Sequence, residues 1–287
     1  MALPDVVVEG SVALVTGAAG GMGEHIARGL ARRGANVVLL DRDETGLARV
    51  AQEIGRESPS VRVTTYVVDL ADRAGTDTLI ARVVSAHPDV NLLFNNAGVA
   101  LGGRFVQTSE QDFEWLLEIN LLAPIRITRA LLPILIENGN AHVVNTSSLF
   151  GLVAPPGQTA YSTSKFGLRG FSESLRHELA EEDLPVGVTV VHPGGIRTNI
   201  AVNARVAAGV DEAESAAQKK SFAAMLSYPA DRAAEDIIEA TINRRPRLLI
   251  GQDAKALDVM ARTRPAGYWK LMKASMAAVA KRKAKTA

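Results

Sequence analysis

The sequence predicts an α/β protein: a doubly wound parallel sheet with helices on both faces. Three observations carry this prediction. Short β-branched runs alternate with helix-length segments along most of the 287 residues. Several runs, such as NVVLL and VNLLF, are apolar at consecutive positions, which is typical of strands covered on both faces. The apolar fraction of 47% and the charged fraction of 22% are ordinary for a globular protein with a sizeable core.

Seven segments are predicted to be strands, namely residues 12–16, 36–40, 61–68, 90–95, 141–146, 186–191 and 247–250. Between them, apolar residues recur every three or four positions, as at Leu47, Val50 and Ile54, which indicates helices. Strands separated by helical crossovers form right-handed units that share one parallel sheet. Because the alternation runs unbroken to Gly251, we expect a single domain over residues 1–258.

Composition excludes several kinds of chemistry. The chain has no Cys, which excludes disulfides, iron–sulfur clusters and a thiol nucleophile, and its five His lack metal-binding spacing. With 32 Lys+Arg against 31 Asp+Glu, nothing in the overall charge favours nucleic acid. The most apolar stretch, residues 121–136, contains two Arg and two Pro, and the N-terminus is a poor signal peptide. We therefore expect a soluble cytoplasmic protein without a metal.

Two segments stand apart from this pattern. The Ala-rich residues 199–228 lie between a strand end and a helix, where a long insertion is typical of a substrate lid. Residues 259–287 contain no acidic residue and carry an apolar stripe, which predicts a basic amphipathic C-terminal extension; the stripe consists of Trp269, Met272, Met276 and Val279. We expect it to pack on its own chain or a neighbouring subunit, with contact to an anionic membrane surface as the alternative.

A glycine-rich turn follows the first strand and opens a helix; it reads Thr16-Gly17-Ala18-Ala19-Gly20-Gly21-Met22-Gly23. Glycines at such a turn let the backbone approach a pyrophosphate, whose charge the helix N-terminus favours. The spacing is T-G-x-x-x-G-x-G, and a tight turn without a ligand is the alternative. Its position after the first strand favours a dinucleotide site.

Polar residues follow the next three strands. Asp41 ends the second strand, where a carboxylate accepts hydrogen bonds from the adenosine ribose and repels a 2′-phosphate, which favours NAD over NADP. Arg42 weakens this discrimination because a guanidinium can reach a phosphate. Asp69 and the Asn95-Asn96-Ala97-Gly98 run end the third and fourth strands, and ligands gather at such carboxyl ends. Plain turns are the alternative for these residues.

The sharpest constellation is Ser148 at a strand end with Tyr161 and Lys165 four residues apart on one helix face. An ammonium near a phenol favours the phenolate, so we predict that the pKa of Tyr161 lies below its reference value of about 10. Such a Tyr acts as an acid or base near neutral pH. Taken alone, Y-x-x-x-K is a common surface pair, and the serine behind a cofactor turn favours the catalytic interpretation. For His192, at the end of a strand, a place in the cleft is the alternative to a structural role.

These motifs, together with Asn120, Pro193-Gly194 and Thr198, occur in an order that resembles the classical short-chain dehydrogenase/reductase family over roughly residues 10–251. The resemblance implies a seven-stranded Rossmann-like catalytic domain and hydride transfer between a nicotinamide cofactor and an alcohol or carbonyl carbon. It also implies a homodimer or homotetramer assembled through the helices that contain Asn120 and Tyr161.

The resemblance further implies four catalytic residues. Tyr161 would be the general acid/base, and Lys165 would bind the nicotinamide ribose. Ser148 would bond the substrate oxygen, and Asn120 would hold a water of a proton relay. The cofactor, NAD rather than NADP, would be bound by Gly17, Gly21, Met22, Gly23, Asp41, Arg42, Asp69, Leu70, Asn96, Gly98, Tyr161, Lys165, Pro193, Gly194, Ile196 and Thr198.

The substrate wall is predicted to be residues 149–156, residues 99–105 and the lid. These segments are apolar and lack a cationic clamp, so we expect a neutral lipophilic secondary alcohol or ketone. A 3-oxoacyl thioester reductase is the alternative enzyme, although such members usually prefer NADPH and Asp41 argues against it. A non-catalytic nucleotide-binding scaffold is the alternative from a different class.

Overall fold

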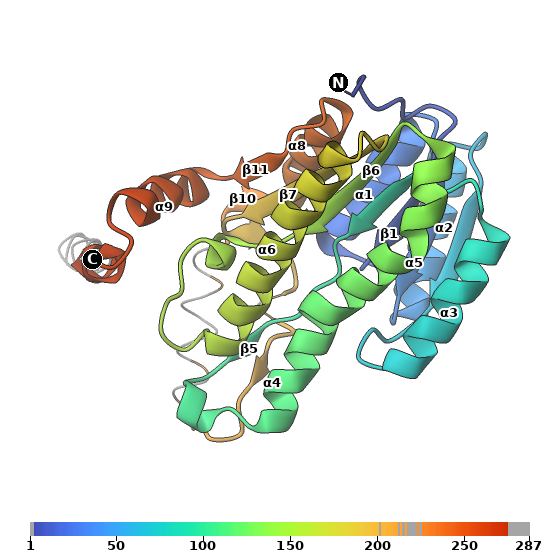
Figure 1. The fold of residues 1–287 in the computed structure, drawn as a ribbon. Helices are drawn as coiled ribbons and strands as arrows, with labels where there is room; N and C mark the ends of the chain where they lie inside the picture. Colours follow the sequence, from blue (N-terminus) through green and yellow to red (C-terminus); the bar gives the residue numbers. More distant parts are fainter. Residues whose placement is uncertain are drawn as a thin grey trace.

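The computed structural model describes residues 3–200, 202–211, 213, 216, 223 and 226–274. A parallel sheet of seven strands in the order β11-β7-β6-β4-β1-β2-β3 forms its centre (Figure 1). The strands are β1 (Val12–Thr16), β2 (Asn36–Asp41), β3 (Val63–Val67), β4 (Leu92–Asn95), β6 (Ala141–Thr146), β7 (Val186–Pro193) and β11 (Arg247–Ile250). The predicted fold class and all seven strands are confirmed, with bounds that differ by no more than about two residues.

The chain reverses direction across the sheet next to β1. From β1 it moves outward to β2 and β3, and it then returns to place β4 on the other side of β1. Thr16 lies opposite Leu40, and Val15 lies opposite Phe94, so the ends of three strands emerge at one edge. A crevice at the carboxyl ends beside such a reversal is where this kind of sheet binds ligands.

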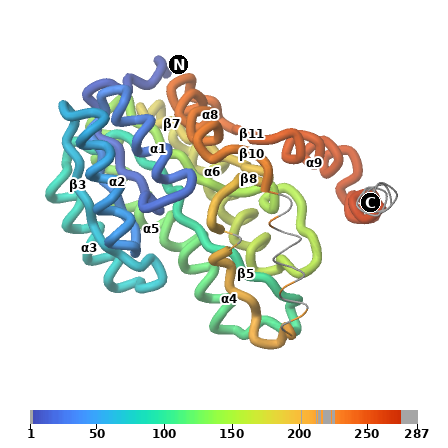
Figure 2. Tube along the Cα trace, turned by 180° about the vertical axis from the view of Figure 1, so that it is seen from behind, coloured from blue at the N-terminus to red at the C-terminus, as the bar shows by residue number. Residues whose placement is uncertain are grey.

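Helices cover both faces of the sheet (Figures 1 and 2). One face carries α1 (Gly21–Arg32), α2 (Glu44–Glu57) and α8 (Ala230–Ile242), and the other carries α3 (Arg73–Ala86), α5 (Ala123–Asn138) and α6 (Thr159–Glu181). Each face has its own apolar core because side chains alternate along a strand. Ala13 and Val15 of β1 lie in the first core, whereas Val12 and Leu14 lie in the second.

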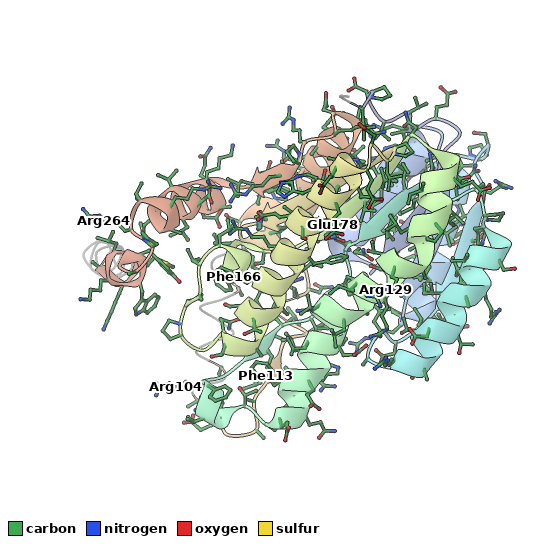
Figure 3. The ribbon with its side chains drawn as sticks, viewed as in Figure 1. Arg104, Phe113, Arg129, Phe166, Glu178 and Arg264 are labelled. Carbon is green, nitrogen blue, oxygen red and sulfur yellow. The ribbon has the colours of Figure 1, made fainter. Side chains whose placement is uncertain are left out.

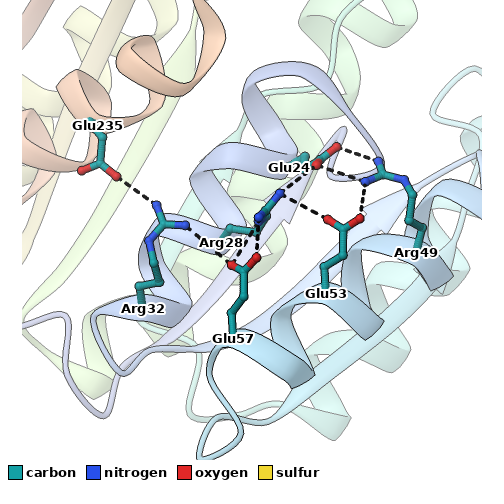
Figure 4. Close-up of polar contacts among 7 residues, drawn as sticks. All are labelled: Glu24, Arg28, Arg32, Arg49, Glu53, Glu57 and Glu235. Atoms are coloured by element: carbon teal, nitrogen blue, oxygen red, sulfur yellow. Dashed lines mark hydrogen bonds and ion pairs between the residues drawn. The ribbon is translucent and has the colours of Figure 1, made fainter.

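An ionic network joins α1, α2 and α8 on the first face (Figure 4). Arg28 of α1 pairs with Glu53 of α2 at 3.2 Å, and Arg32 pairs with Glu235 of α8 at 3.2 Å. Such partly exposed pairs stabilise a fold only weakly one by one. The network also reaches the glycine-rich turn, because Arg49 of α2 donates a hydrogen bond to the Ala19 carbonyl at 3.1 Å.

The run Glu110–Asn138 consists of α4 (Glu110–Leu117), the π-helical turn η2 (Glu118–Leu122) and α5. By length and composition it is the one stretch among the described residues that is apolar enough to cross a membrane. Its inner residues pack in the second core under the sheet, as Ile127, Leu131 and Leu135 do, which accounts for that composition.

The two atypical segments are described only in part. Arg205–Val206 forms β9 and pairs with β5 (Leu101–Gly102), while β10 (Tyr228–Pro229) pairs with β8 (Ile196–Arg197). Most of the predicted lid after residue 211 lies outside the described residues, and so do Met276 and Val279 of the predicted C-terminal stripe. Helix α9 (Gln252–Thr263) leaves the edge strand β11 and extends away from the sheet (Figure 1). The proposed division at residue 258 stays a prediction.

Candidate active site

A cavity of about 440 Å³ lies at the carboxyl edge of the sheet, beside the reversal between β1 and β4. It is lined by the glycine-rich turn, the ends of β2 and β3, the loop after β4 and the segment after β8. Ten of the predicted cofactor residues line it: Gly17, Gly21, Met22, Asp41, Arg42, Asp69, Leu70, Asn96, Gly98 and Thr198. The structure therefore brings together residues from five separate segments of the chain.

The glycine-rich turn packs backbone against backbone. Gly17 has φ +68°, and a Cβ on it would lie 2.8 Å from Ala97 Cα. A Cβ on Gly23, which lies beneath the turn, would lie 2.0 Å from the Gly17 carbonyl oxygen. Helix α1 begins at Gly21 without a side-chain cap, so its first N–H groups remain available to an anion. This cradle fits a dinucleotide pyrophosphate.

The carboxylate of Asp41 is held by backbone groups. Its Oδ2 accepts from Ala19 N–H at 3.0 Å, and its Oδ1 accepts from Asp43 N–H at 3.1 Å. Arg42 beside it is exposed and forms no ion pair with the other residues that the structure describes. A carboxylate is thus held on the cavity wall, and an exposed guanidinium lies next to it.

Asn96 ties the loop after β4 to the end of β1. Its Nδ2 donates to the Thr16 carbonyl at 3.2 Å, and the N–H groups of Asn96 and Ala97 donate to Thr16 Oγ1 at 3.1 and 3.0 Å. Asn96 Oδ1 is buried and has no hydrogen-bond partner within the described part of the chain, so it remains able to accept from a ligand. Thr16 lines the cavity and is a site residue that the motif analysis missed.

Ser148 and Tyr161 meet where η3 (Leu149–Gly151) and α6 begin. Ser148 caps η3, with its Oγ accepting from Phe150 N–H at 3.1 Å, and its hydroxyl is close enough to the Tyr161 phenol to lower the pKa of that phenol. The Phe150 ring contacts Tyr161 edge-on, with 6.1 Å between ring centroids. The two hydroxyls predicted to act on one substrate oxygen are therefore adjacent.

Lys165 and Asn120 complete the group. Lys165 Nζ lies 5.7 Å from the centroid of the Tyr161 ring and donates to the Thr146 carbonyl at 2.9 Å. Asn120 is buried in the π-helical turn η2. A Cβ on Gly98 would lie 3.3 Å from Lys165 Nζ and 3.4 Å from Asn120 Oδ1, so both side chains reach the same point on the cavity wall.

The pKa of Tyr161 departs from the prediction. Burial raises the pKa of the phenol above its usual value, and the hydrogen bond with Ser148 only partly offsets this rise. Burial also lowers the pKa of Lys165 to about 8. The prediction of a lowered Tyr161 pKa is wrong for the protein alone, because the Lys165 ammonium bonds the Thr146 carbonyl rather than the phenol.

Six predicted cofactor residues do not line the cavity: Gly23, Tyr161, Lys165, Pro193, Gly194 and Ile196. The last three belong to the segment that leads from β7 into β8. Gly194 N–H donates to the Ile250 carbonyl at 2.9 Å, and Pro193 ends β7 beside it. Ile196 packs in the core with 4% of its surface exposed. These residues support the segment that carries Thr198, whose Cγ2 would lie 3.3 Å from a Cβ on Gly21. Their direct contact with a cofactor stays a prediction.

Trp115 and Arg205 also line the cavity, and the motif analysis missed both. The Arg205 guanidinium lies 3.6 Å from the centroid of the Trp115 ring, a cation–π contact. The pairing of β5 with β9 and an ion pair of Arg205 with Asp112 of α4 at 3.4 Å bring these residues together, and no local pattern in the sequence signals it. The cavity therefore has one cationic side chain that the sequence analysis did not expect.

The predicted substrate wall is anchored by the C-terminal segment. The Ala154 N–H donates to the Tyr268 hydroxyl at 2.9 Å, and Leu152 and Val153 beside it are buried. The Phe105 ring packs edge-on against Phe113 of α4, with 6.2 Å between ring centroids. Figure 3 shows Phe113 near the end of the molecule formed by α4 and the loop before it. Apolar side chains thus gather around this end.

A family model described as short chain dehydrogenase matches residues 11–208. The chain belongs to the short-chain dehydrogenase family. SadH of Mycobacterium tuberculosis, an oxidoreductase by name, is 39% identical over 272 residues, which is 94% of this chain and 96% of SadH. Dehydrogenase/reductase SDR family member 7B of Bos taurus is 32% identical, covering 94% of this chain and 82% of its own.

Two solved short-chain dehydrogenases resemble the structure closely. The enzyme from Burkholderia phymatum in complex with NAD has a TM-score of 0.81 at 29% identity, covering 90% of this chain and 95% of its own. The enzyme from Sphingobium yanoikuyae in complex with NADPH has a TM-score of 0.72 at 25% identity, covering 94% and 95%. This short-chain dehydrogenase is accordingly an oxidoreductase of the nicotinamide-dependent type, with a Rossmann-like fold.

Proposed function

We propose that this short-chain dehydrogenase interconverts a lipophilic secondary alcohol and its ketone, with NAD as cofactor and Tyr161 as general acid/base. The observation that carries the proposal is the adjacency of the Ser148 and Tyr161 hydroxyls, with Lys165 one helical turn away and its Nζ 3.3 Å from a Cβ placed on Gly98 of the cavity wall. An acid/base hydroxyl beside a dinucleotide cradle suits proton transfer coupled to hydride transfer.

The cofactor would lie along the cavity wall. Gly17 and Gly21 leave the backbone open to the pyrophosphate, and the uncapped start of α1 favours its charge. Asn96 would bond the dinucleotide through its free Oδ1. When bound, the nicotinamide ring donates or accepts the hydride and, in its oxidised form, adds a positive charge to the site.

The protein's own residues would manage the proton. In ketone reduction, Tyr161 donates its proton to the substrate oxygen; in alcohol oxidation, its phenolate accepts the proton. Ser148 donates a hydrogen bond to the same oxygen as negative charge develops there. Burial by itself raises the Tyr161 pKa, and a positive charge brought next to the phenol by the oxidised cofactor would oppose that effect.

The fixed carboxylate of Asp41 supports NAD. It lies on the cavity wall with two backbone N–H groups on its oxygens, which hold it in place. A carboxylate there accepts from ribose hydroxyls and repels a 2′-phosphate. Arg42, exposed on the same wall, is the residue through which NADP would compete.

Apolar side chains in the segments around Tyr161 support a lipophilic substrate. Phe150 contacts Tyr161, and Leu152 and Val153 follow it on the buried side of the loop. The exposed rings and side chains of Phe105 and Val106 continue this apolar character beyond the loop after β4. The apolar part of a ketone or secondary alcohol can pack against such a surface.

We also propose a homodimer or homotetramer in the cytoplasm. Leu122 of η2 is 43% exposed and Phe166 of α6 is 39% exposed, and a Cβ on Gly167 would lie 2.9 Å from Leu121 Cδ2, so these two elements present adjacent apolar groups. Figure 3 shows Phe166 on the face formed by α5 and α6. Light scattering of the purified chain tests this; a monomer at micromolar concentration would contradict it.

A cofactor and substrate screen tests the reaction. Secondary alcohols and ketones of increasing size are assayed with NAD(H) and NADP(H), with Tyr161→Phe as the matched inactive variant. We expect turnover with NAD that rises with substrate apolarity and falls at least about a thousandfold in the variant. Turnover confined to 3-oxoacyl thioesters with NADPH favours the reductase alternative. Cofactor binding without turnover of any substrate favours the non-catalytic scaffold.

A further inference from the structure

We propose that His192 is a positioning residue that fixes Ser148, and through it Tyr161, for proton transfer. His192 is the penultimate residue of β7 and directly precedes Pro193. It touches neither the cavity nor the Tyr161 phenol, so it would act only through Ser148. The inference rests on the proposed roles of Ser148 and Tyr161.

The hydrogen bond between His192 and Ser148 can run in only one direction. His192 Nδ1 lies 3.0 Å from the Ser148 carbonyl oxygen. A carbonyl oxygen only accepts, so Nδ1 carries the hydrogen and the neutral ring leaves Nε2 bare. Nε2 is buried and has no hydrogen-bond partner within the described ranges. Among the residues in those ranges, no acceptor near Nε2 therefore competes for the hydrogen that Nδ1 carries. The bond to Ser148 is thus the polar contact that orients the ring.

The ring stays neutral through the range in which a dehydrogenase is assayed. Its charged surroundings are Arg247 of β11 and Arg169 and Glu173 of α6. Burial lowers the pKa of His192 to about 4, with the hydrogen bond to Ser148 opposing that effect. The Nδ1–H donor is therefore present in neutral and alkaline solution alike, and it supplies no titration of its own.

The scaffold around His192 is rigid. His192 lies opposite Leu249 in the ladder between β7 and β11, and its side chain is fully buried. Ser148, by contrast, lies in a loop, and its Oγ already accepts a hydrogen bond from Phe150 N–H. The histidine therefore connects a strand of the central sheet to the backbone of the loop residue that bonds the Tyr161 phenol.

Loss of this donor would change the loop rather than the fold. The Ser148 carbonyl would lose one of its two partners and keep only the Gly151 N–H at 2.9 Å, so the backbone of Ser148 would be tied to the turn that follows it but no longer to the sheet. Ser148 Oγ would then move relative to the Tyr161 hydroxyl. Because the Ser148 bond lowers the pKa of Tyr161, its weakening should raise the apparent pKa of the catalytic phenol.

Two substitutions in the full-length chain separate positioning from general structure. His192→Asn places an amide N–H near the position of Nδ1, whereas His192→Leu fills the space without a donor. For ketone reduction, we expect kcat of the Leu variant to fall by about tenfold. The pKa at which kcat falls on the alkaline side of the pH profile should rise. The Asn variant should stay within about threefold of the unmodified protein. The Kd for NADH, measured by fluorescence, should remain the same in both.

Four outcomes decide the matter. Full activity of the Leu variant overturns the inference, and so does an equal loss in both variants, which would mark a packing role. A loss in kcat with an unshifted pH profile overturns it as well. Should the Leu variant not fold, His192→Gln replaces it, because its amide reaches the Nε2 position only. Tyr161→Phe is assayed in parallel: if it keeps activity, the proposed function fails, irrespective of His192.

Discussion

The side chain of Asn120 and the backbone of Val99 hold each other through two hydrogen bonds. Asn120 Oδ1 accepts from Val99 N–H at 2.8 Å, and Asn120 Nδ2 donates to the Val99 carbonyl at 2.9 Å. The π-helical turn η2 is thereby fastened to the loop that follows β4, directly beside Gly98. This bond pair connects the helical turn that contains Asn120 to the cofactor wall.

Asn120→Ala should lower the free energy of unfolding by about 1–3 kcal/mol, because both Val99 backbone groups lose their partner in a buried place. Urea unfolding followed by circular dichroism measures this. The exposed Gln111 of α4 offers a matched control, and Gln111→Ala should change the stability by less than about 0.5 kcal/mol. Equal stability of both variants would contradict the structural role of Asn120.

Gly23→Ala should weaken NADH binding by more than about tenfold. The added Cβ would lie 2.0 Å from the Gly17 carbonyl oxygen and 2.7 Å from Asn96 Nδ2, so the turn must shift to make room. A fluorescence titration with NADH checks the prediction. Gly55→Ala in α2 is the control, since its Cβ meets no atom within 4 Å. Unchanged affinity in Gly23→Ala would show that the cradle does not hold the cofactor.

Asp41→Asn should shift the cofactor preference toward NADP by about tenfold or more, because it removes the charge that repels the 2′-phosphate while it keeps the side-chain shape. Arg42→Ala should act in the opposite direction, since it removes a cation that lies beside Asp41 on the same wall. The measurement is kcat/KM with NAD and with NADP for one alcohol. If neither variant alters the cofactor preference, these two residues do not determine the choice between NAD and NADP.

Acid should destabilise the protein partly through His142. Its Nε2 lies 2.7 Å from Thr189 Oγ1, which itself donates to the Arg245 carbonyl, so the ring is neutral and donates from Nε2. Burial lowers the pKa of His142 to about 3. Below about pH 6.5 the unfolded chain binds a proton that the folded chain refuses, so stability falls as the pH drops toward 3.

His142→Gln keeps a donor at the Nε2 position and removes the titration. Between pH 7 and pH 5, the unmodified protein should lose about 2 kcal/mol more unfolding free energy than this variant. Urea unfolding at the two pH values gives the difference directly. Identical pH dependence in the two proteins would mean that the ring takes up its proton while folded.

Tyr268→Phe should raise KM for bulky substrates by a few fold and leave the NADH affinity unchanged. The variant removes the hydroxyl that accepts from Ala154 N–H, so the loop that follows Ser148 loses its anchor to the C-terminal segment. Steady-state kinetics with a small and a large ketone test this. A uniform rise in KM for both ketones would place the effect elsewhere than in the loop.

The strands and the motif residues were predictable because their signals are local. An apolar run such as that of β4 reports burial on both faces, and a glycine at a strand end reports a turn with positive φ, as at Gly17. The order of such signals along the chain also restricts the topology. The predicted contacts at the cavity follow from this order, since parallel strands end at one edge.

The amino-acid sequence by itself determined the sheet and the glycine-rich cradle, because periodicity and motif spacing are properties of neighbouring residues. The four catalytic candidates came from the resemblance of its motifs to the short-chain dehydrogenase family. Only the tertiary structure decided how Arg205 meets Trp115, how His192 reaches Ser148 and which direction burial moves the pKa of Tyr161. These depend on pairings between distant segments and on desolvation. Such pairings form, and such desolvation occurs, only once the chain has packed.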